Sequence, residues 1–192
     1  DLKKSNPGLN LAAFISGTGS AGTLGAGDYL KREQGTKIVA MEPIECPTML
    51  YNGYGAHNIQ GIGDKHLPLI QNVMNSDVVA GVSDASCDAL DVLFNSDVGR
   101  EYLAKRRGLD PKLVAQLENF GLSSIANMLA AIKTARYYDL TENDVIVTVA
   151  TDGAEMYGSE REKAVARDFP GGFDAVCAGE VFGQHLAGLD ND

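Results

Sequence analysis

Runs of apolar residues alternate along the chain with segments of helical periodicity, and this alternation predicts an α/β fold. The first apolar run, residues 9–16, ends in a cluster of glycines and is followed by a helix-compatible segment at residues 24–32. A second apolar run, residues 37–42, stops at Pro43. Strand, helix and strand in this order form one βαβ unit with a parallel crossover. We therefore expect a three-layer α/β chain, with a mostly parallel sheet and helices on both faces.

The rest of the chain continues the alternation. The β-branched run at residues 145–150 is typical of a buried strand, and residues 125–138 show the apolar spacing of a long helix with one buried face. Residues 47–70 are expected to be an ordered loop, and the acidic tail, residues 183–192, is expected to fray. The other predicted elements are a strand at 78–82 and helices at 86–94, 100–107 and 112–118.

Composition narrows the class of protein. The chain has 192 residues, 44% hydrophobic and 22% charged, as in a soluble globular chain that forms one domain or most of one. Its net charge of −10 argues against partners such as nucleic acid or a membrane surface. Three cysteines without CxxC spacing favour a reducing cytoplasm, and no histidine suggests a metal site. The sequence contains no apolar run of membrane-spanning length and no signal peptide.

The glycine cluster carries the first candidate chemistry. Gly17, Gly19 and Gly22 form a GxGxxG motif between the first predicted strand and helix, where main-chain amides and the helix dipole can cradle a phosphate. Glu42, at the end of the second predicted strand, could hold the ribose of a dinucleotide. A fragment of a NAD(P)-binding Rossmann oxidoreductase is therefore one interpretation, and an ordinary tight turn is another.

Four segments in this order resemble the cysteine synthase and cystathionine β-synthase family, the fold type II enzymes that use pyridoxal 5′-phosphate. The resemblance covers about residues 9 to 157, and a nicotinamide fold has no reason to carry the last three segments. It implies β-elimination or β-replacement on serine- or cysteine-type amino acids, as a lyase or transferase of amino-acid metabolism, in a homo-oligomer such as a dimer. The segments are Gly19-Ser20-Ala21-Gly22-Thr23-Leu24, Val39-Ala40-Met41-Glu42-Pro43, His57-Asn58-Ile59-Gln60-Gly61-Ile62-Gly63 and Gly121-Leu122-Ser123-Ser124.

The resemblance assigns roles to two of these segments and removes one from Glu42. A segment beside the cofactor ring, Gln60, Gly61 and Ile62, would leave room for the substrate at its glycine. Glu42 closes a strand in this family and belongs to packing. The residues that the resemblance assigns to the cofactor phosphate are Gly19, Ser20, Ala21, Gly22 and Thr23.

The family's catalytic lysine has no counterpart in this sequence. In the family, a lysine in the N-terminal half forms an imine with the cofactor, and an Asn-containing substrate loop follows it. None of the nine lysines here matches that motif. We therefore expect residues 1–192 to be the C-terminal part of a cofactor-binding α/β domain, either processed from a longer precursor or completed by a second polypeptide. A non-catalytic subunit that kept the fold is a third interpretation.

A second departure concerns the cofactor's pyridine nitrogen. The family places a hydroxyl residue there, two residues before a Glu-x-Tyr, and Gly153 stands at that position ahead of Glu155-Met156-Tyr157. Thr151, Asp152 or a water must then reach the nitrogen. A carboxylate from Asp152 would keep the nitrogen protonated, whereas a hydroxyl would leave it neutral. The alternative for Asp152 is that it only caps its turn.

A third departure is an apparent insertion between Phe94 and Glu118 with a cluster of basic residues. In an otherwise acidic chain, this segment could be a lid, a dimer contact or a docking place, or simply a solvated helix face. Its basic residues are Arg100, Lys105, Arg106, Arg107 and Lys112.

Overall fold

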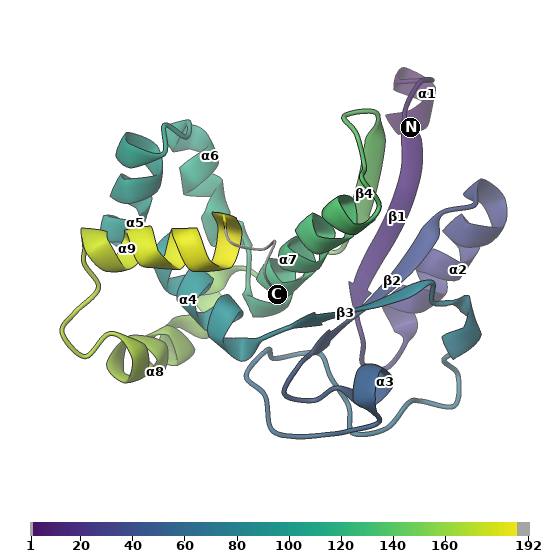
Figure 1. Ribbon diagram of the computed structural model, residues 1–192, viewed down its shortest axis with the longest axis horizontal. Coiled ribbons are helices and arrows are strands. Elements are labelled where there is room, and N and C mark those ends of the chain that lie inside the picture. Colours follow the sequence, from purple (N-terminus) through teal and green to yellow (C-terminus); the bar gives the residue numbers. More distant parts are fainter. Residues whose placement is uncertain (1, 188–192) are drawn as a thin grey trace. The chain divides into compact units, whose positions relative to one another are not determined.

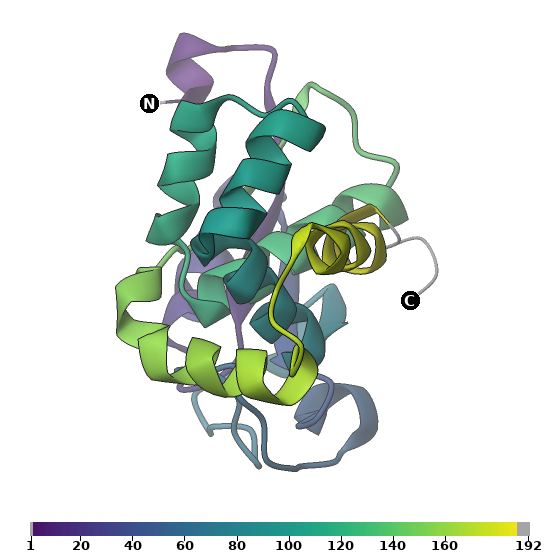
Figure 2. The ribbon, with the colours of Figure 1, turned by 90° about the vertical axis from the view of Figure 1, so that its left-hand side faces the viewer.

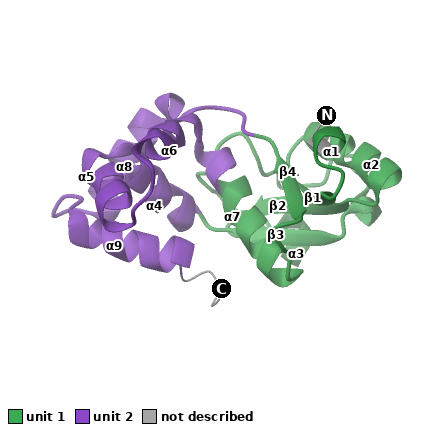
Figure 3. Cartoon of the chain, turned by 90° about the horizontal axis from the view of Figure 1, so that it is seen from above, with its two compact units in different colours: residues 1–83, 126–149 green, residues 84–125, 150–192 purple. Residues whose placement is uncertain are grey.

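The computed structural model describes residues 2–187, which divide between two compact units (Figure 3). Unit 1 comprises Asp1–Ser83 and Ala126–Val149, and unit 2 comprises Asp84–Ile125 and Ala150–Asp192. Unit 1 contains the sheet, and unit 2 is helical in the part of the chain that is described. The end of the predicted fraying tail, residues 188–192, lies outside the described residues.

Unit 1 is built on a parallel sheet with strand order β3-β2-β1-β4. β1 lies inside the sheet and pairs with both β2 and β4, and its Ile15 stands opposite Val39 of β2 and Thr148 of β4. The βαβ unit predicted from the first apolar runs is therefore present. The strands are β1 (Asn10–Gly17), β2 (Lys37–Pro43), β3 (Val78–Val82) and β4 (Asp144–Thr148).

Helices α2 (Gly22–Gln34) and α7 (Leu122–Tyr137) lie on opposite sides of the sheet (Figure 1). Gly27 brings α2 close to the sheet, because a Cβ there would lie 2.8 Å from the Phe14 ring. On α7, the Lys133 ammonium donates to the carbonyl oxygen of Gly81 at 3.2 Å. This arrangement confirms the three-layer α/β fold with helices on both faces.

The predicted strand at residues 145–150 differs in burial and in extent. It begins at Asp144 and ends at Thr148, and its side chains are half-buried or exposed. The reason is its position, because β4 is an edge strand that pairs only with β1. The prediction of a buried strand was therefore wrong.

The loop predicted over residues 47–70 contains a short helix, α3 (Thr48–Tyr51). Glu42, at the end of β2, is buried and accepts hydrogen bonds from the N–H groups of Met49 (3.0 Å) and Leu50 (2.8 Å). A carboxylate at the start of a helix satisfies amides that have no partner within the helix. Glu42 thus has a packing role, as the family resemblance implies, and does not face a ribose site.

Unit 2 packs its helices around α4, and Figure 2 shows several of them side by side. The helix predicted at residues 100–107 is divided between the end of α5 and a π-helical turn, Tyr102–Arg106. The expected fraying does not begin at residue 183, because α9 continues into a second π-helical turn, Gly183–Ala187. The helices are α4 (Asp84–Asn95), α5 (Asp97–Glu101), α6 (Pro111–Gln116), α8 (Gly158–Asp168) and α9 (Ala175–Phe182), and 3-10 turns cover Leu117–Asn119 and Ala154–Tyr157. A further short helix, α1 (Leu2–Ser5), precedes β1 in unit 1.

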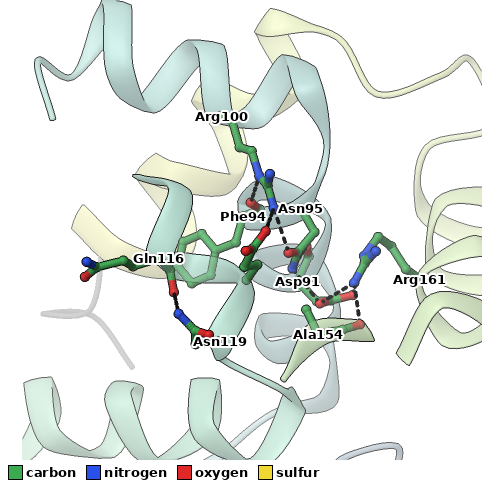
Figure 4. Close-up of polar contacts among 9 residues, drawn as sticks. Asp91, Phe94, Asn95, Arg100, Gln116, Asn119, Ala154 and Arg161 are labelled. Atoms are coloured by element: carbon green, nitrogen blue, oxygen red, sulfur yellow. Dashed lines mark hydrogen bonds and ion pairs between the residues drawn. The ribbon is translucent and has the colours of Figure 1, made fainter. Parts of the chain in front are cut away.

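Part of the basic insertion is structural. The Arg100 guanidinium donates to the carbonyl oxygen of Phe94 at 2.9 Å and to the carboxylate of Glu118 at 3.3 Å (Figure 4). The Arg107 guanidinium lies 4.1 Å from the centre of the Phe182 ring. These two cations bind within unit 2, so a purely solvated face is the wrong interpretation for them. A lid, a dimer contact or a docking place stays a prediction.

Candidate functional site

The glycine turn between β1 and α2 presents main-chain N–H groups at its surface. The residue that precedes α2 is Ala21, in the left-handed conformation with φ 66°, and no described side chain caps the first turn of the helix. Ser20, Gly22 and Thr23 are exposed. Uncapped amides at a helix start, with the helix dipole behind them, make a site for an anion.

The space above this turn is open. A Cβ added at Gly19 would find its nearest neighbour, the Ile62 Cα, at 3.9 Å, and one added at Gly22 would find only the Ser20 Oγ at 3.9 Å. An added Cβ at either position would therefore lie in open space. The Thr23 hydroxyl is hydrogen-bonded to that of Ser16 on β1, which fixes the start of α2. The turn thus fits a phosphate group.

The segment Gln60-Gly61-Ile62, which the resemblance places beside the cofactor ring, lies next to the glycine turn. The N–H of Gly63 donates to the carbonyl oxygen of Thr18 at 2.6 Å, and the Ile62 side chain lies over Gly17, where a Cβ would be 2.6 Å from it. Gly61 and Gly63 have φ values of 83° and 79°. Left-handed backbone at both positions explains why glycine stands there.

Thr18, Gly63 and His57 were given no site role in the sequence analysis. The N–H of Thr18 donates to the carbonyl oxygen of Met41 at 2.7 Å, so Thr18 links the end of β2 to Gly63. The His57 ring lies behind Gly63, and its Nδ1 is buried without a hydrogen-bond partner among the described residues. The second glycine of the Ile-Gln-Gly-Ile-Gly segment was the available signal for this contact.

In unit 2, Thr151, Asp152 and Gly153 lie against the Gly121-Leu122-Ser123-Ser124 segment. The Thr151 hydroxyl is 3.0 Å from that of Ser123, and the N–H of Thr151 donates to the Ser124 hydroxyl at 3.3 Å. The carbonyl oxygen of Asp152 accepts from the N–H of Gly121 at 2.7 Å. Ser123 and Thr151 are 28 residues apart in the sequence. Their two segments therefore share one hydrogen-bond network.

The carboxylate of Asp152 has a partner inside this network. The Tyr157 hydroxyl donates to Asp152 Oδ2 at 3.1 Å. Burial of the phenol, together with this hydrogen bond and the nearby negative charge, raises the pKa of Tyr157 to about 12. The tyrosine of the Glu-x-Tyr therefore holds the Asp152 carboxylate.

Gly153 has little room for a side chain. A Cβ at this position would lie 2.2 Å from Glu155 Oε2, so a serine would require the end of the Glu155 side chain to move. The backbone of Gly153 is extended, with φ −89° and ψ 167°, so conformation alone does not require glycine here. The structure gives no reason why glycine stands here instead of the hydroxyl residue expected in the family.

The described residues contain neither a cluster of metal ligands nor a membrane-spanning helix. No group of three or more His, Cys, Asp or Glu side chains in residues 2–187 is arranged to hold a metal ion. Within the same residues, no helix combines the length and the apolar character needed to cross a bilayer.

Comparisons with known proteins give one consistent group of relatives. No family model matches the sequence. Over 149 residues, 77% of this chain and 42% of the relative, the sequence is 32% identical to cysteine synthase B of Campylobacter jejuni. The chain spans less than half the length of the curated relatives it matches.

Solved structures point to the same group. A hydrogen sulfide-producing enzyme from Fusobacterium nucleatum matches with a TM-score of 0.61 and 27% identity, over 81% of this chain and 41% of that one. An O-acetylserine dependent cystathionine β-synthase from Helicobacter pylori matches with a TM-score of 0.59 and 28% identity, over 82% of this chain and 45% of that one.

Proposed function

We propose that this chain is the C-terminal part of an enzyme for β-replacement or β-elimination. The reason is that the chain belongs to the cysteine synthase-like family of fold type II enzymes, which use pyridoxal 5′-phosphate. The amino-acid substrates would be of the serine or cysteine type. The observation that carries the proposal is the open glycine turn at the start of α2, with Gly63 hydrogen-bonded beside it. The alternative, a NAD(P)-binding oxidoreductase, is not favoured, because Glu42 is buried against α3 and the relatives are cysteine synthases.

The residues of the glycine turn would hold the cofactor phosphate. When bound, pyridoxal phosphate supplies an electron sink for the carbanion at the α-carbon of the amino acid. The chain contributes to this chemistry by fixing the phosphate through the amides of Gly19, Ser20, Ala21, Gly22 and Thr23 and through the dipole of α2. The Ser20 hydroxyl is exposed at the turn and could add a hydrogen bond.

Gln60, Gly61 and Ile62 would border the cofactor ring. Gly61 is exposed, and a Cβ there would have no neighbour within 4 Å, so this position leaves room for a small amino acid to approach. Ile62 is partly buried over Gly17 and would supply an apolar contact. The hydrogen bond between Gly63 and Thr18 holds the segment in place.

The pyridine nitrogen would be served by the segment Thr151, Asp152 and Gly153. The Thr151 hydroxyl and the Asp152 carboxylate are both exposed and are held by Ser123 and Tyr157. We favour a hydroxyl or a water at the nitrogen, because a carboxylate partner would change the protonation of the ring and with it the chemistry.

The lysine that binds the cofactor and the substrate loop would come from a polypeptide that corresponds to the part of the relatives outside the matched region. Its matched relatives are about twice as long, and the name of one structural neighbour states that it depends on O-acetylserine. We therefore propose a partner polypeptide with the lysine, a small amino-acid substrate and assembly into a homo-oligomer. A cytoplasmic location is our further proposal, supported by the free thiols of Cys46, Cys87 and Cys177.

The test is the affinity of the purified chain for pyridoxal phosphate, followed by the fluorescence of the cofactor. Gly22→Val would place a branched side chain in the space that the amides face and should weaken binding at least about tenfold, as expected when the close approach of backbone to ligand is blocked. Gly25→Val is the matched control, because Gly25 is also an exposed glycine of α2 with no neighbour within 4 Å of an added Cβ. Equal affinity in the two variants would place the phosphate elsewhere.

A second experiment separates an enzyme from a non-catalytic subunit. Borohydride reduction of the native assembly should trap the cofactor on a lysine, and peptide mapping should place that lysine outside residues 1–192. A trapped lysine within this chain would contradict the proposed division of the site. Native assembly that carries the cofactor without any trapped lysine would favour the non-catalytic alternative.

A further inference from the structure

Unit 1 exposes large apolar side chains in one stretch of the sequence, residues 44–74. Nine of the fourteen exposed large hydrophobic side chains of the described residues lie in this stretch. Five of them are at least three-quarters exposed, and we call these five the apolar loop surface. They are Tyr51 (78%), Tyr54 (75%), Leu69 (105%), Ile70 (78%) and Met74 (83%).

The apolar loop surface stands on an ordered framework. The carboxylate of Glu42 holds the N–H groups at the start of α3, which carries Tyr51. The side-chain amide of Gln71 donates to the Met49 sulfur at 3.4 Å, so Gln71 lies beside α3. The Asn72 side chain accepts from the N–H of Met74 at 3.1 Å. Fixed loops that expose apolar side chains are characteristic of an interface.

This surface is continuous with the glycine turn. The Thr48 hydroxyl of α3 donates to the carbonyl oxygen of Asp64 at 2.5 Å, and Asp64 directly follows Gly63, which is hydrogen-bonded to Thr18. Figure 1 shows α3 and its neighbouring loops at the same end of the sheet as the carboxyl end of β1. A polypeptide that reaches the glycine turn from this side would therefore pass over the apolar loop surface.

We propose that the apolar loop surface docks the polypeptide that carries the cofactor-binding lysine. This inference rests on the proposed function, which requires such a polypeptide at the glycine turn. Two observations support this occupant. More than half the length of the matched relatives lies outside the region that this chain covers. Residues 44–74 also contain only three charged side chains, Glu45, Asp64 and Lys65, and depletion of charge is typical of a stable interface core.

The test uses the part of Campylobacter jejuni cysteine synthase B that this chain does not match, produced as a separate, labelled polypeptide. Its affinity for the chain is measured by fluorescence anisotropy. The double variant Leu69→Glu/Ile70→Glu should bind it at least about tenfold more weakly than the unaltered chain, since charges would enter an apolar contact. Tyr137→Glu is the control, because Tyr137 is equally exposed at 74% but lies on α7.

Three results would overturn the proposal: no binding by the unaltered chain, equal binding by the double variant, or equal loss in Tyr137→Glu. Loss of self-association in the double variant, with binding of the labelled polypeptide unchanged, would assign the surface to a second copy and would also overturn it. Pyridoxal phosphate binding by the double variant separates the two proposals. The double variant should bind pyridoxal phosphate as tightly as the unaltered chain does. Failure of the unaltered chain to bind the cofactor would contradict the proposed function and would leave the result of the docking experiment unchanged.

Discussion

The main-chain N–H of Gly63 donates to the carbonyl oxygen of Thr18 at 2.6 Å. This hydrogen bond joins the glycine turn to a segment more than forty residues further along the sequence. The N–H of Thr18 in turn donates to Met41 at the end of β2. Three segments of unit 1 are therefore fixed relative to one another at the carboxyl end of the sheet. Ligands of open parallel sheets bind at this end, which makes the Thr18–Gly63 contact part of the candidate site.

We expect Gly63→Ala to destabilise unit 1 through two effects. A residue other than glycine at φ 79° costs about 1–2 kcal/mol. In addition, the new Cβ would lie 2.3 Å from the His57 ring, and an overlap of this kind adds about 1–3 kcal/mol. The measurement is the free energy of unfolding in urea.

Gly61→Ala is the matched control for this substitution. Gly61 has nearly the same φ, 83°, but an added Cβ meets nothing within 4 Å. The difference between the two variants therefore isolates the contact with His57. Equal losses of stability would show that the His57 ring does not support Gly63.

Asp77→Asn should lower the free energy of unfolding at neutral pH and should make that free energy depend less on pH in the acid range. Burial acts to raise the pKa of Asp77, but the N–H of Ile38 and the Lys31 ammonium outweigh it, so the pKa is lowered. A carboxyl group with a lowered pKa in the folded state stabilises the fold above its unfolded pKa, about 3.8, and loses that contribution as the pH falls. The expected loss at pH 7 is about 1–2 kcal/mol.

Urea unfolding from about pH 7 down to about pH 2 tests this expectation, since the contribution of Asp77 begins to fall as the pH approaches its unfolded pKa and is lost through its lower folded pKa. The unaltered chain should lose more stability over the window than Asp77→Asn does. Glu142→Gln, at an exposed position, is the control and should follow the unaltered chain. The same acid dependence in the Asp77 variant would remove Asp77 from the explanation.

The sequence predicted the parts of the fold that depend on local pattern. The βαβ unit and the helix near residues 122–137 were expected, and the structure contains them. These features follow from apolar periodicity or from motifs that stand in one short stretch.

The features that were missed depend on tertiary contacts or on local backbone conformation, which apolar periodicity does not encode. The four residues of α3 need the carboxylate of Glu42, which periodicity cannot reveal. A β-branched run such as that of β4 is compatible with a central strand and with an edge strand. The sequence therefore could not predict how far β4 is buried, because burial depends on the neighbouring strands. The left-handed residue of the glycine turn is Ala21, beside glycines that adopt this conformation more easily.

We expect Asp91→Asn to destabilise unit 2 by about 3–5 kcal/mol, the usual cost of breaking a buried ion pair. The Arg161 guanidinium donates to both carboxylate oxygens of Asp91, at 2.9 and 3.2 Å, and Asn95 donates to the same group (Figure 4). Burial raises the pKa of Asp91 despite the opposing effect of Arg161. The substitution would leave the Arg161 guanidinium without a carboxylate at this position, although it would still donate to the Ala154 carbonyl oxygen at 3.0 Å (Figure 4).

Thermal and urea unfolding measure this loss, with Glu101→Gln as the control. Glu101 pairs with Lys105 at 2.7 Å on the surface of the same unit, and an exposed ion pair contributes little to stability. A loss in Asp91→Asn no larger than the loss in Glu101→Gln would show that the Asp91–Arg161 pair does not hold α4 and α8 together.

The last prediction concerns the contact between Tyr157 and Asp152. Of the seven tyrosines, Tyr157 should ionise late, because its burial and its hydrogen bond to Asp152 raise its pKa to about 12. A raised pKa stabilises the fold below the ordinary value for tyrosine, about 10, and this contribution disappears as the pH rises toward 12. Ultraviolet titration of the phenolates should show the late step, and Tyr157→Phe should remove it.

Asp152→Asn tests whether the carboxylate stays with Tyr157. Loss of the negative charge should move the Tyr157 titration toward lower pH, although burial, the largest cause of the shift, remains. An unchanged titration would mean that Asp152 points away from Tyr157 in solution and that its carboxylate is available to another donor. A lowered pKa of Tyr157 in this variant would mean that one oxygen of Asp152 is hydrogen-bonded to Tyr157 in the unaltered chain. The Thr151 hydroxyl, whose contact is with Ser123, would then be the polar group of this segment that can reach a ligand more easily.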